Sequence, residues 1–277
     1  MSSLPSGMES LAELVRFAPD VYGFRYLNYV AMFIVTRDGV ILADPIGQGN
    51  PRTPTMIKEA IRSVTEQPVK YVVYSHSAAD HATGGVVFAD TAQFVGHRRT
   101  AEKLTAANDP TTPVPAVTFD EHLTVELGGR RLDLYSADLS ASDDYIILHD
   151  PASRVIMTVD FVQPRNVPFR GLLGHPDRIV ERLRWIYDSL DFDLLISGHA
   201  SPQMGGTRGD VLEQRQYYLD LTEALASARA AGLADDSPEL TAATRAALEP
   251  RYGSWRRFDE FLPLNIAGMI RWRAEDS

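Results

Sequence analysis

Short apolar stretches alternate with longer amphipathic ones over much of the chain. Residues 30–36 and 40–44 are mainly apolar and flank Asp38-Gly39, a dipeptide that favours the tight turn of a β-hairpin. Residues 53–65 predict an amphipathic helix, because their apolar side chains recur at helical spacing: Met56, Ile57, Ala60, Ile61 and Val64. This alternation of strands and helices indicates an α/β layered fold.

Residues 116–136 alternate apolar and polar side chains around a Gly-Gly pair, and they predict a second hairpin. Helical patterns dominate the rest of the chain toward the C-terminus. Residues 176–190 then carry an apolar stripe typical of an amphipathic helix. Residues 210–231 and 257–273 are also expected to be helical. Their apolar side chains are expected in the core, with a homodimer surface as the alternative.

The composition favours one globular domain. The chain has 277 residues, 44% of them hydrophobic, which is enough for a substantial core. No linker rich in Pro, Gly or Ser divides it, so we expect a single domain over residues 1–277. Its core should span about 20–205 and a helical extension about 206–277. Cysteine is absent, which excludes disulfides, thiolate metal sites and a cysteine nucleophile.

Charge narrows the classes of partner. The 27 basic and 37 acidic residues leave a formal net charge of -10, which argues against nucleic acid and anionic membranes. No apolar run approaches the roughly 20 residues that span a bilayer. The first residues also lack the basic and apolar regions of a signal peptide. We therefore expect a cytoplasmic protein that acts on a small molecule.

One segment carries the candidate chemistry. The strand predicted over residues 69–74 runs into His76-Ser77-Ala78-Ala79-Asp80-His81, which holds two imidazoles and a carboxylate. Both groups are ligands of zinc and other divalent metals. The small residues between them permit the sharp turn that would bring the side chains together. We predict a metal site here; the alternative is a polar loop that happens to contain two histidines.

This segment resembles the metallo-β-lactamase superfamily signature His-x-His-x-Asp-His, with Ala78 in place of the middle histidine. Other segments resemble the family in the expected order, over roughly residues 20–200. They include a strand ending in Asp44, a strand ending in Asp160 and a last strand that delivers His199. The resemblance implies a four-layer αββα sandwich with added C-terminal helices.

The resemblance also implies which metal ligands are missing. The family holds two metals, and the first needs the two leading motif histidines and a histidine from a later His-Thr-x-Gly-Asp element. Here His76 is kept, but Ala78 and Ser140 occupy the other two positions. A methyl group cannot coordinate, and a serine hydroxyl is a poor ligand. We therefore expect this first site to be empty or very weak.

The second site of the family is complete. It corresponds to Asp80, His81 and His199, with Asp160 as the bridging carboxylate, and we expect one divalent metal there. Zinc is the first expectation, with iron or manganese as alternatives. His76 is a further candidate ligand, and His76 and Asp80 are the candidate catalytic residues, His76 as a general base or hydrogen-bond donor. The alternative is a decayed site whose side chains only hydrogen-bond one another and hold no metal.

Three functions remain open on this basis. The first is a one-metal hydrolase of a small ester, lactone, amide or thioester. The second is a member with a lost or altered metal site that acts as a cyclase, lyase or isomerase in secondary metabolism. The third is a non-catalytic binding protein.

Residues near the motif have structural interpretations. We expect Asp44 to order the motif loop by hydrogen bonding. Asp143 and Asp144 are interpreted as a loop cap before the next strand, with an acid and base pair as the alternative. His97 is expected on the surface or at a helix start, and His149 in a solvated turn.

Overall fold

The computed structural model describes residues 11–47, 50–139, 143–169, 172, 174–199 and 205–275. The chain forms two compact units. The sandwich unit comprises residues 1–137, 143–159 and 192–205, and the helical unit comprises residues 138–142, 160–191 and 206–277. Organisation as one domain stays a prediction.

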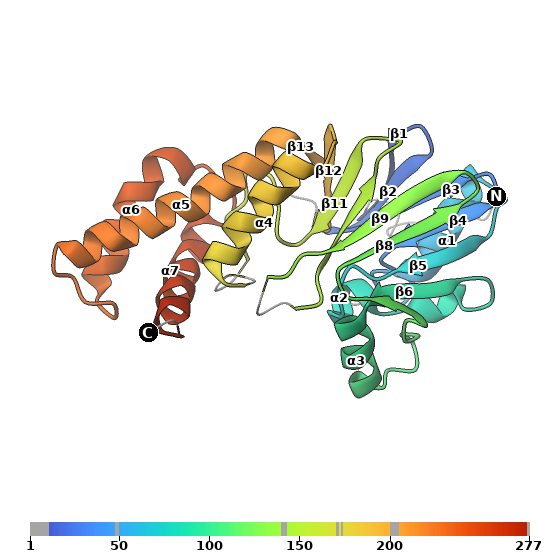
Figure 1. The fold of residues 1–277 in the computed structure, drawn as a ribbon, viewed down its shortest axis with the longest axis horizontal. Coiled ribbons are helices and arrows are strands. Elements are labelled where there is room, and N and C mark those ends of the chain that lie inside the picture. The colour runs from blue at the N-terminus through green and yellow to red at the C-terminus, as the bar shows by residue number, and fades with distance from the viewer. Residues whose placement is uncertain are drawn as a thin grey trace. The chain divides into compact units, whose positions relative to one another are not determined.

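The sandwich unit contains a seven-stranded sheet in sequence order (Figure 1). Its strands are β1 (Ala12–Ala18), β2 (Val21–Tyr26), β3 (Tyr29–Thr36), β4 (Gly39–Ala43), β5 (Val69–Val73), β6 (Gln93–His97) and β7 (Val117–Phe119). The first four strands are antiparallel, and β4 to β7 are parallel. The predicted hairpin is confirmed as β3 and β4, which turn at Asp38-Gly39, where Gly39 has φ +154°.

The second sheet has six strands in the order β13-β12-β11-β10-β9-β8. They are β8 (His122–Leu127), β9 (Arg130–Ser136), β10 (Ile146–Asp150), β11 (Val155–Val159), β12 (Leu194–Ser197) and β13 (Gly205–Thr207). The second predicted hairpin is β8 and β9, joined by Gly128 and Gly129 at φ +56° and +82°. Glycine suits both positions because it adopts positive φ without a steric penalty. The start of the predicted range is different: β7 belongs to the first sheet.

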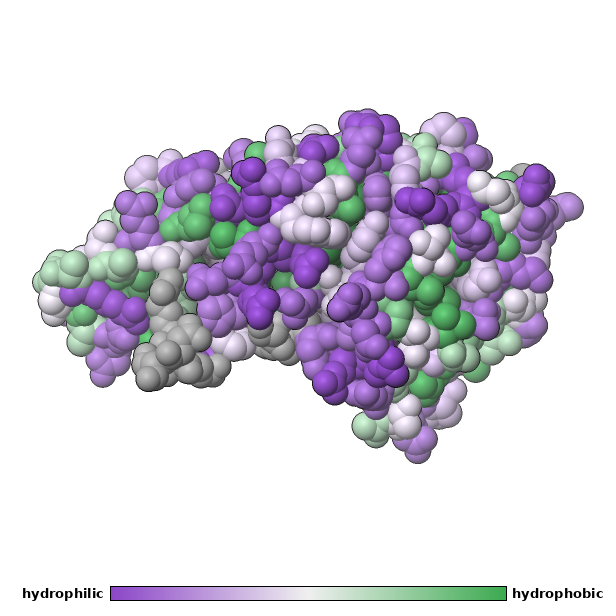
Figure 2. Space-filling model, in the orientation of Figure 1, coloured by the Kyte–Doolittle hydropathy of each residue, from purple (hydrophilic) through white to green (hydrophobic). Residues whose placement is uncertain are grey.

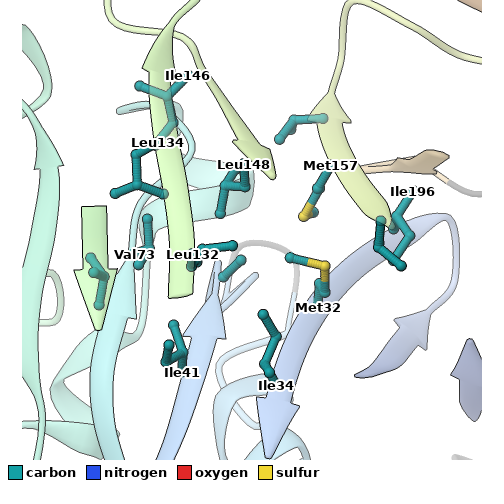
Figure 3. Packing of buried hydrophobic residues seen from close by; sticks show 14 of the residues in the cluster. Met32, Ile34, Ile41, Val73, Leu132, Leu134, Ile146, Leu148, Met157 and Ile196 are labelled. Atoms are coloured by element: carbon teal, nitrogen blue, oxygen red, sulfur yellow. The ribbon is translucent and has the colours of Figure 1, made fainter. Parts of the chain in front are cut away.

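The two sheets share one apolar core. Side chains from β3, β4 and β5 point toward side chains from β9, β10, β11 and β12 (Figure 3). The labelled members are all almost fully buried: Met32, Ile34, Ile41, Val73, Leu132, Leu134, Ile146, Leu148, Met157 and Ile196. Alternate residues of a strand face opposite sides, so the other faces of β3, β4 and β5 contribute to a second apolar cluster.

Helices pack on the other face of the first sheet. They are α1 (Thr53–Val64), the short α2 (Ala79–Ala82), the 3-10 helix η2 (Gly85–Phe88) and α3 (Arg98–Ala107). The predicted helix over 53–65 is confirmed as α1, which buries Met56, Ile57 and Ile61 in the second apolar cluster with Phe33 and Leu42.

The helical unit contains α4 (Pro176–Ser189), α5 (Arg208–Ala230), α6 (Pro238–Tyr252) and α7 (Phe258–Glu275). The sequence patterns predicted α4, α5 and α7 but not α6. Helix α6 buries Leu240, Thr244, Leu248 and Tyr252 at helical spacing, and a polar threonine and Pro250 interrupt its apolar stripe. None of the described helices is long and apolar enough to cross a membrane. Hydrophilic residues dominate the surface visible in Figure 2.

Candidate metal centre

The motif begins where β5 ends. Tyr74, Ser75 and His76 continue the strand direction as buried residues, and the chain then turns into α2. Ala78 is the residue before this helix and has extended backbone angles, φ -60° and ψ 138°. Helix α2 therefore starts at Ala79 and carries Asp80 and His81 back toward the end of the strand.

Asp44 ties the motif together from the end of the neighbouring strand. Its Oδ1 accepts the Ser75 backbone N–H at 2.8 Å. Its Oδ2 accepts the Ser75 hydroxyl at 2.6 Å and faces His81 Nδ1 at 3.1 Å. Asp44 is fully buried with φ +60°, a conformation that aspartate tolerates better than most residues. The prediction that Asp44 orders this loop is confirmed.

These bonds define where protons sit on two histidines. A carboxylate oxygen accepts, so His81 donates from Nδ1 and keeps its Nε2 lone pair for another partner. The Ser75 hydroxyl donates to Asp44, so its oxygen is left to accept from His76 Nδ1 at 2.9 Å. By the same logic, His76 keeps its lone pair on Nε2. Ser75 was not singled out from the sequence.

His199 reaches the same place from the second sheet. It follows β12 and Gly198, whose missing side chain is a packing requirement. A Cβ on Gly198 would lie 2.6 Å from Val159 Cγ1 and 2.8 Å from His81 Cε1. Tyr29 packs its ring against His199 with centroids 5.1 Å apart, and the two backbones form an isolated antiparallel bridge.

Three candidate ligand atoms form a small triangle. His81 Nε2 lies 3.2 Å from His199 Nε2, and Asp80 Oδ2 lies 3.8 Å from each of these nitrogens. The circle through three atoms with these separations has a radius of about 2.1 Å, which matches the distances of nitrogen and oxygen ligands to zinc. The donor set therefore fits one divalent ion without rearrangement of the backbone.

Solvent access differs among these donors. The His81 side chain is fully buried, whereas 26% of the Asp80 side chain and 19% of the His199 side chain are exposed. An ion at the triangle would be held on its inner side by His81 and would keep an outward position for water or substrate, as catalytic zinc sites do.

His76 belongs to the same cluster. His76, Asp80 and His81 each offer a donor atom, and these atoms all lie within 4.8 Å of one another. The His76 ring stacks on Tyr145 with centroids 4.0 Å apart and an angle of 18° between planes. His76 is therefore buried and held by Ser75 and Tyr145 beside the triangle.

Asp160 and the positions that correspond to the first metal complete the set of predicted ligands. Asp160 directly follows Val159, the last residue of β11, and opens a segment of the helical unit; its role as a ligand stays a prediction. Ser140 lies outside the described residues. The resemblance assigned His76, Ala78 and Ser140 to the first metal, and we call this half of the centre the Ala78 side. Ala78 has no donor atom, so among the described residues of this half only His76 can bind a metal.

Asp144 supports the motif loop from the second sheet. Its Oδ2 accepts the Ser77 backbone N–H at 2.7 Å, and its Oδ1 accepts Lys103 Nζ at 2.7 Å. Burial acts to raise the pKa of Asp144, but the hydrogen bonds from Lys103 and Ser77 outweigh it, and the pKa is lowered. The loop-cap interpretation of Asp144 agrees with these contacts.

Two other histidines test the sequence interpretation. His97 is the N-cap of α3 and accepts the Arg99 N–H, so its predicted role at a helix start is confirmed. The expectation for His149 is wrong: it lies on β10, almost fully buried, with its Cα paired to Asp133 of β9. Strand β10 continues through His149 to Asp150, so the turn begins only after this histidine.

Comparison with known proteins gives consistent matches. The model of the metallo-β-lactamase superfamily matches residues 26–231. The alpha subunit of 2,4-dinitroanisole O-demethylase from Nocardioides sp. (strain JS1661) is 26% identical over 246 residues, which cover 82% of this chain and 69% of that protein.

Solved structures share the fold at low identity. The stereoselective inverting sec-alkylsulfatase Pisa1 from Pseudomonas sp. has a TM-score of 0.72 at 16% identity, over 94% of this chain and 50% of that one. A metallo-β-lactamase from Pontibacter korlensis has a TM-score of 0.59 at 17% identity, over 75% of this chain and 99% of that one. This chain thus spans about half the length of the alkylsulfatase.

Two facing sheets with histidines and carboxylates gathered at strand ends fit the sandwich of the matched family. The chain belongs to the metallo-β-lactamase superfamily, because the family model matches most of its length. The predicted αββα fold class with extra C-terminal helices is confirmed, as is the prediction that the protein is an enzyme of this type.

Proposed function

We propose that this protein is a hydrolase that uses a single divalent metal ion, zinc in the first instance, to cleave a small ester, lactone, amide or thioester. The observation that carries the proposal is the triangle of Asp80 Oδ2, His81 Nε2 and His199 Nε2, whose size matches one ion. Asp160 is proposed as a fourth donor from its position directly after β11.

A bound divalent ion would supply Lewis acidity, polarising a carbonyl oxygen and lowering the pKa of water toward about 7. Asp80 and His199 would hold the ion on the solvent side, and the buried His81 would hold it from the interior. Asp44 holds the His81 proton on Nδ1, which keeps Nε2 available to the ion.

The protein must supply what a second ion supplies in two-metal sites. His76 is the residue placed for this, because Ser75 fixes its proton on Nδ1 and Tyr145 fixes its ring plane. Its Nε2 then accepts a proton from an attacking water and can return that proton to the leaving group. Of the two roles that the sequence left open for His76, the geometry favours the general base.

A second candidate reaction is hydrolysis of an activated aryl methyl ether. It is favoured by the similarity to the O-demethylase alpha subunit, which covers 82% of this chain. The same donors and the same base serve this reaction, in which water attacks the electron-poor ring carbon, the bond from that carbon to the methoxy oxygen breaks, and methoxide leaves and takes up the proton from the base as methanol. A cyclase, lyase or isomerase and a non-catalytic binding protein are the alternatives that the following experiment distinguishes from a hydrolase.

Metal content and turnover test the proposal together. Protein purified without added metal, then titrated with zinc, should bind about one equivalent, and Asp80→Ala should abolish that binding whereas Ser140→Ala should not. Turnover of 4-nitrophenyl acetate, a γ-lactone or 2,4-dinitroanisole should stop on chelation and return with zinc. Less than about a tenth of an equivalent bound, or turnover that survives chelation, contradicts the proposal.

A further inference from the structure

The turn between β2 and β3 holds His199 in place. Asn28 Nδ2 lies 3.3 Å from His199 Nδ1 across the turn. The ring and backbone of Tyr29 contact His199, and the Val30 N–H donates to the Gly198 carbonyl at 2.8 Å. The residues of this turn are consecutive in sequence, so one short segment sets the position of a proposed metal ligand from a distant part of the chain.

The two nitrogens of His199 face different partners. Nδ1 faces the Asn28 amide, while Nε2 faces His81 Nε2 and Asp80 Oδ2. A neutral imidazole carries one proton, so a proton on Nδ1 leaves a lone pair on Nε2, and the reverse also holds. The group opposite Nδ1 therefore influences whether Nε2 can coordinate.

An asparagine amide offers two different atoms to such a partner. Its NH₂ group donates, which favours a lone pair on His199 Nδ1 and a proton on Nε2. Its oxygen accepts, which favours a proton on Nδ1 and a lone pair on Nε2. A half-turn about the Asn28 Cβ–Cγ bond exchanges the two, and Asn28 is exposed, so surrounding side chains do not enclose it.

We infer that Asn28 is a positioning residue that selects the coordinating tautomer of His199 and thereby tunes metal affinity. The inference rests on the proposed metal site. The contrast with His81 supports it, because a buried carboxylate, which only accepts, faces His81 Nδ1. His81 is thus a fixed ligand, whereas His199 is an adjustable one whose partner rotates between donor and acceptor.

Cobalt(II) and zinc titrations of designed variants test this inference. Asn28→Ala should weaken metal binding by about 10–100-fold, the usual effect of losing a hydrogen-bond partner of a ligand. Asn28→Asp keeps an acceptor and removes the donor, so it should bind metal at least as tightly as the wild type. Asn50→Ala is a matched control, since the Asn50 amide bonds Tyr26 Oη at 3.0 Å and should leave affinity unchanged.

Charge needs its own control, because Asn28→Asp also adds a negative charge. Leu27→Asp adds the same charge one residue away, on a side chain that is 48% exposed. If Leu27→Asp raises metal affinity as much as Asn28→Asp does, the effect is electrostatic and the inference is overturned. A clear excess for Asn28→Asp supports it.

A direct readout comes from long-range ¹H–¹⁵N spectra of the zinc-loaded wild-type protein, which need no variant to fold. The His199 proton should be on Nδ1, and in zinc-loaded Asn28→Ala this proton should exchange faster with water, so that its signal broadens. If wild-type protein binds zinc and Asn28→Ala binds it equally well, the inference fails while the proposed function stands. If wild-type protein binds no metal, both fail.

Discussion

The two sides of the candidate metal centre share a frame but differ in donors. On the His81 side, Asp80, His81 and His199 bring three ligand atoms to separations that suit one ion. On the Ala78 side, an alanine occupies the position of a ligand, and His76 stacks on Tyr145. The backbone is anchored on both sides, by Asp44 on one and Asp144 on the other. The loop is thus held by hydrogen bonds even where an alanine stands at a ligand position.

That difference teaches what the fold requires and what the chemistry requires. A carboxylate anchors the loop on each side, because an unpaired N–H of the buried Ser75 or the half-buried Ser77 would destabilise the sandwich. Three ligand atoms converge on the His81 side, and an alanine stands at a ligand position on the Ala78 side. A site reduced in this way is suited to chemistry that needs one ion and one base, and the following variants test whether the two sides are in fact unequal.

The largest effect is expected from His81→Ala. This change removes the innermost ligand, so metal affinity should fall by more than about 100-fold, beyond the range for loss of a ligand's hydrogen-bond partner. His76→Ala should lower turnover but leave most of the metal affinity, since His76 is proposed as the base. Isothermal titration with zinc distinguishes the two.

A matched control for both histidine variants is His97→Ala, which changes a helix N-cap outside the metal centre. Its metal affinity should equal that of the wild type, with a cost of about 1 kcal/mol in stability from the lost cap. An equal fall in zinc affinity in His76→Ala and His81→Ala would contradict the proposal that the metal is held mainly by the His81 side.

The next effect concerns the anchor on the His81 side. Asp44→Ala removes the acceptor for His81 Nδ1 and for the Ser75 hydroxyl, so zinc affinity should fall by about 10–100-fold. It should also lower the free energy of unfolding, because the Ser75 N–H is left without its acceptor. Zinc titration and urea unfolding measure the two effects; unchanged zinc affinity in a folded variant would count against the role of Asp44.

The anchor on the Ala78 side should affect stability more than metal. Asp144→Asn weakens the bonds to Lys103 and Ser77, so the free energy of unfolding at pH 7 should fall by about 1–3 kcal/mol with zinc affinity nearly unchanged. The pKa of Asp144 is lowered in the folded protein, so its contribution is present above the unfolded-state pKa and is lost as pH falls through the folded value.

The difference in stability between wild type and Asp144→Asn should accordingly shrink as the pH is lowered below about 4, close to the ordinary aspartate pKa. Urea unfolding at a series of pH values measures it. A difference that stays constant down to strongly acidic pH would show that the Asp144 carboxylate is not the source of the effect.

The sequence predicted the positions of these residues better than their connections. The spacing of apolar residues located both hairpins and the helices α4, α5 and α7 of the helical unit. A buried face repeats every second residue in a strand and about every 3.6 residues in a helix. The motif predicted His76, Asp80 and His81 as neighbours, and the strand-end positions pointed to Asp44 and His199. Helix α6 was not predicted, because the polar Thr244 occupies a buried position where the helical pattern expects an apolar residue.

The hydrogen bonds between these residues could not be predicted from the sequence, for a physical reason. Ser75 and Asn28 act through hydrogen bonds between segments 31 and 171 residues apart, and no local period records such pairs. His149 was misassigned because a buried strand can carry a polar residue when the neighbouring strand supplies a polar partner position, here Asp133. Long-range pairing, rather than residue type, decides these cases.

The smallest effect, and the sharpest test of the inequality, is expected from Ala78→His. The extended backbone at Ala78 accepts any side chain, and the position is half-buried, so the variant should fold. It restores one missing imidazole beside His76 but leaves Ser140 in place of the other, and two histidines seldom suffice for zinc. The first equivalent should therefore bind with affinity within about threefold of wild type, less than the effect of losing a hydrogen-bond partner of a ligand. A second should bind only at much higher concentration. Tight binding of two zinc equivalents by this single variant would mean that the Ala78 side has donors beyond His76. The two sides would then differ by a single residue, Ala78.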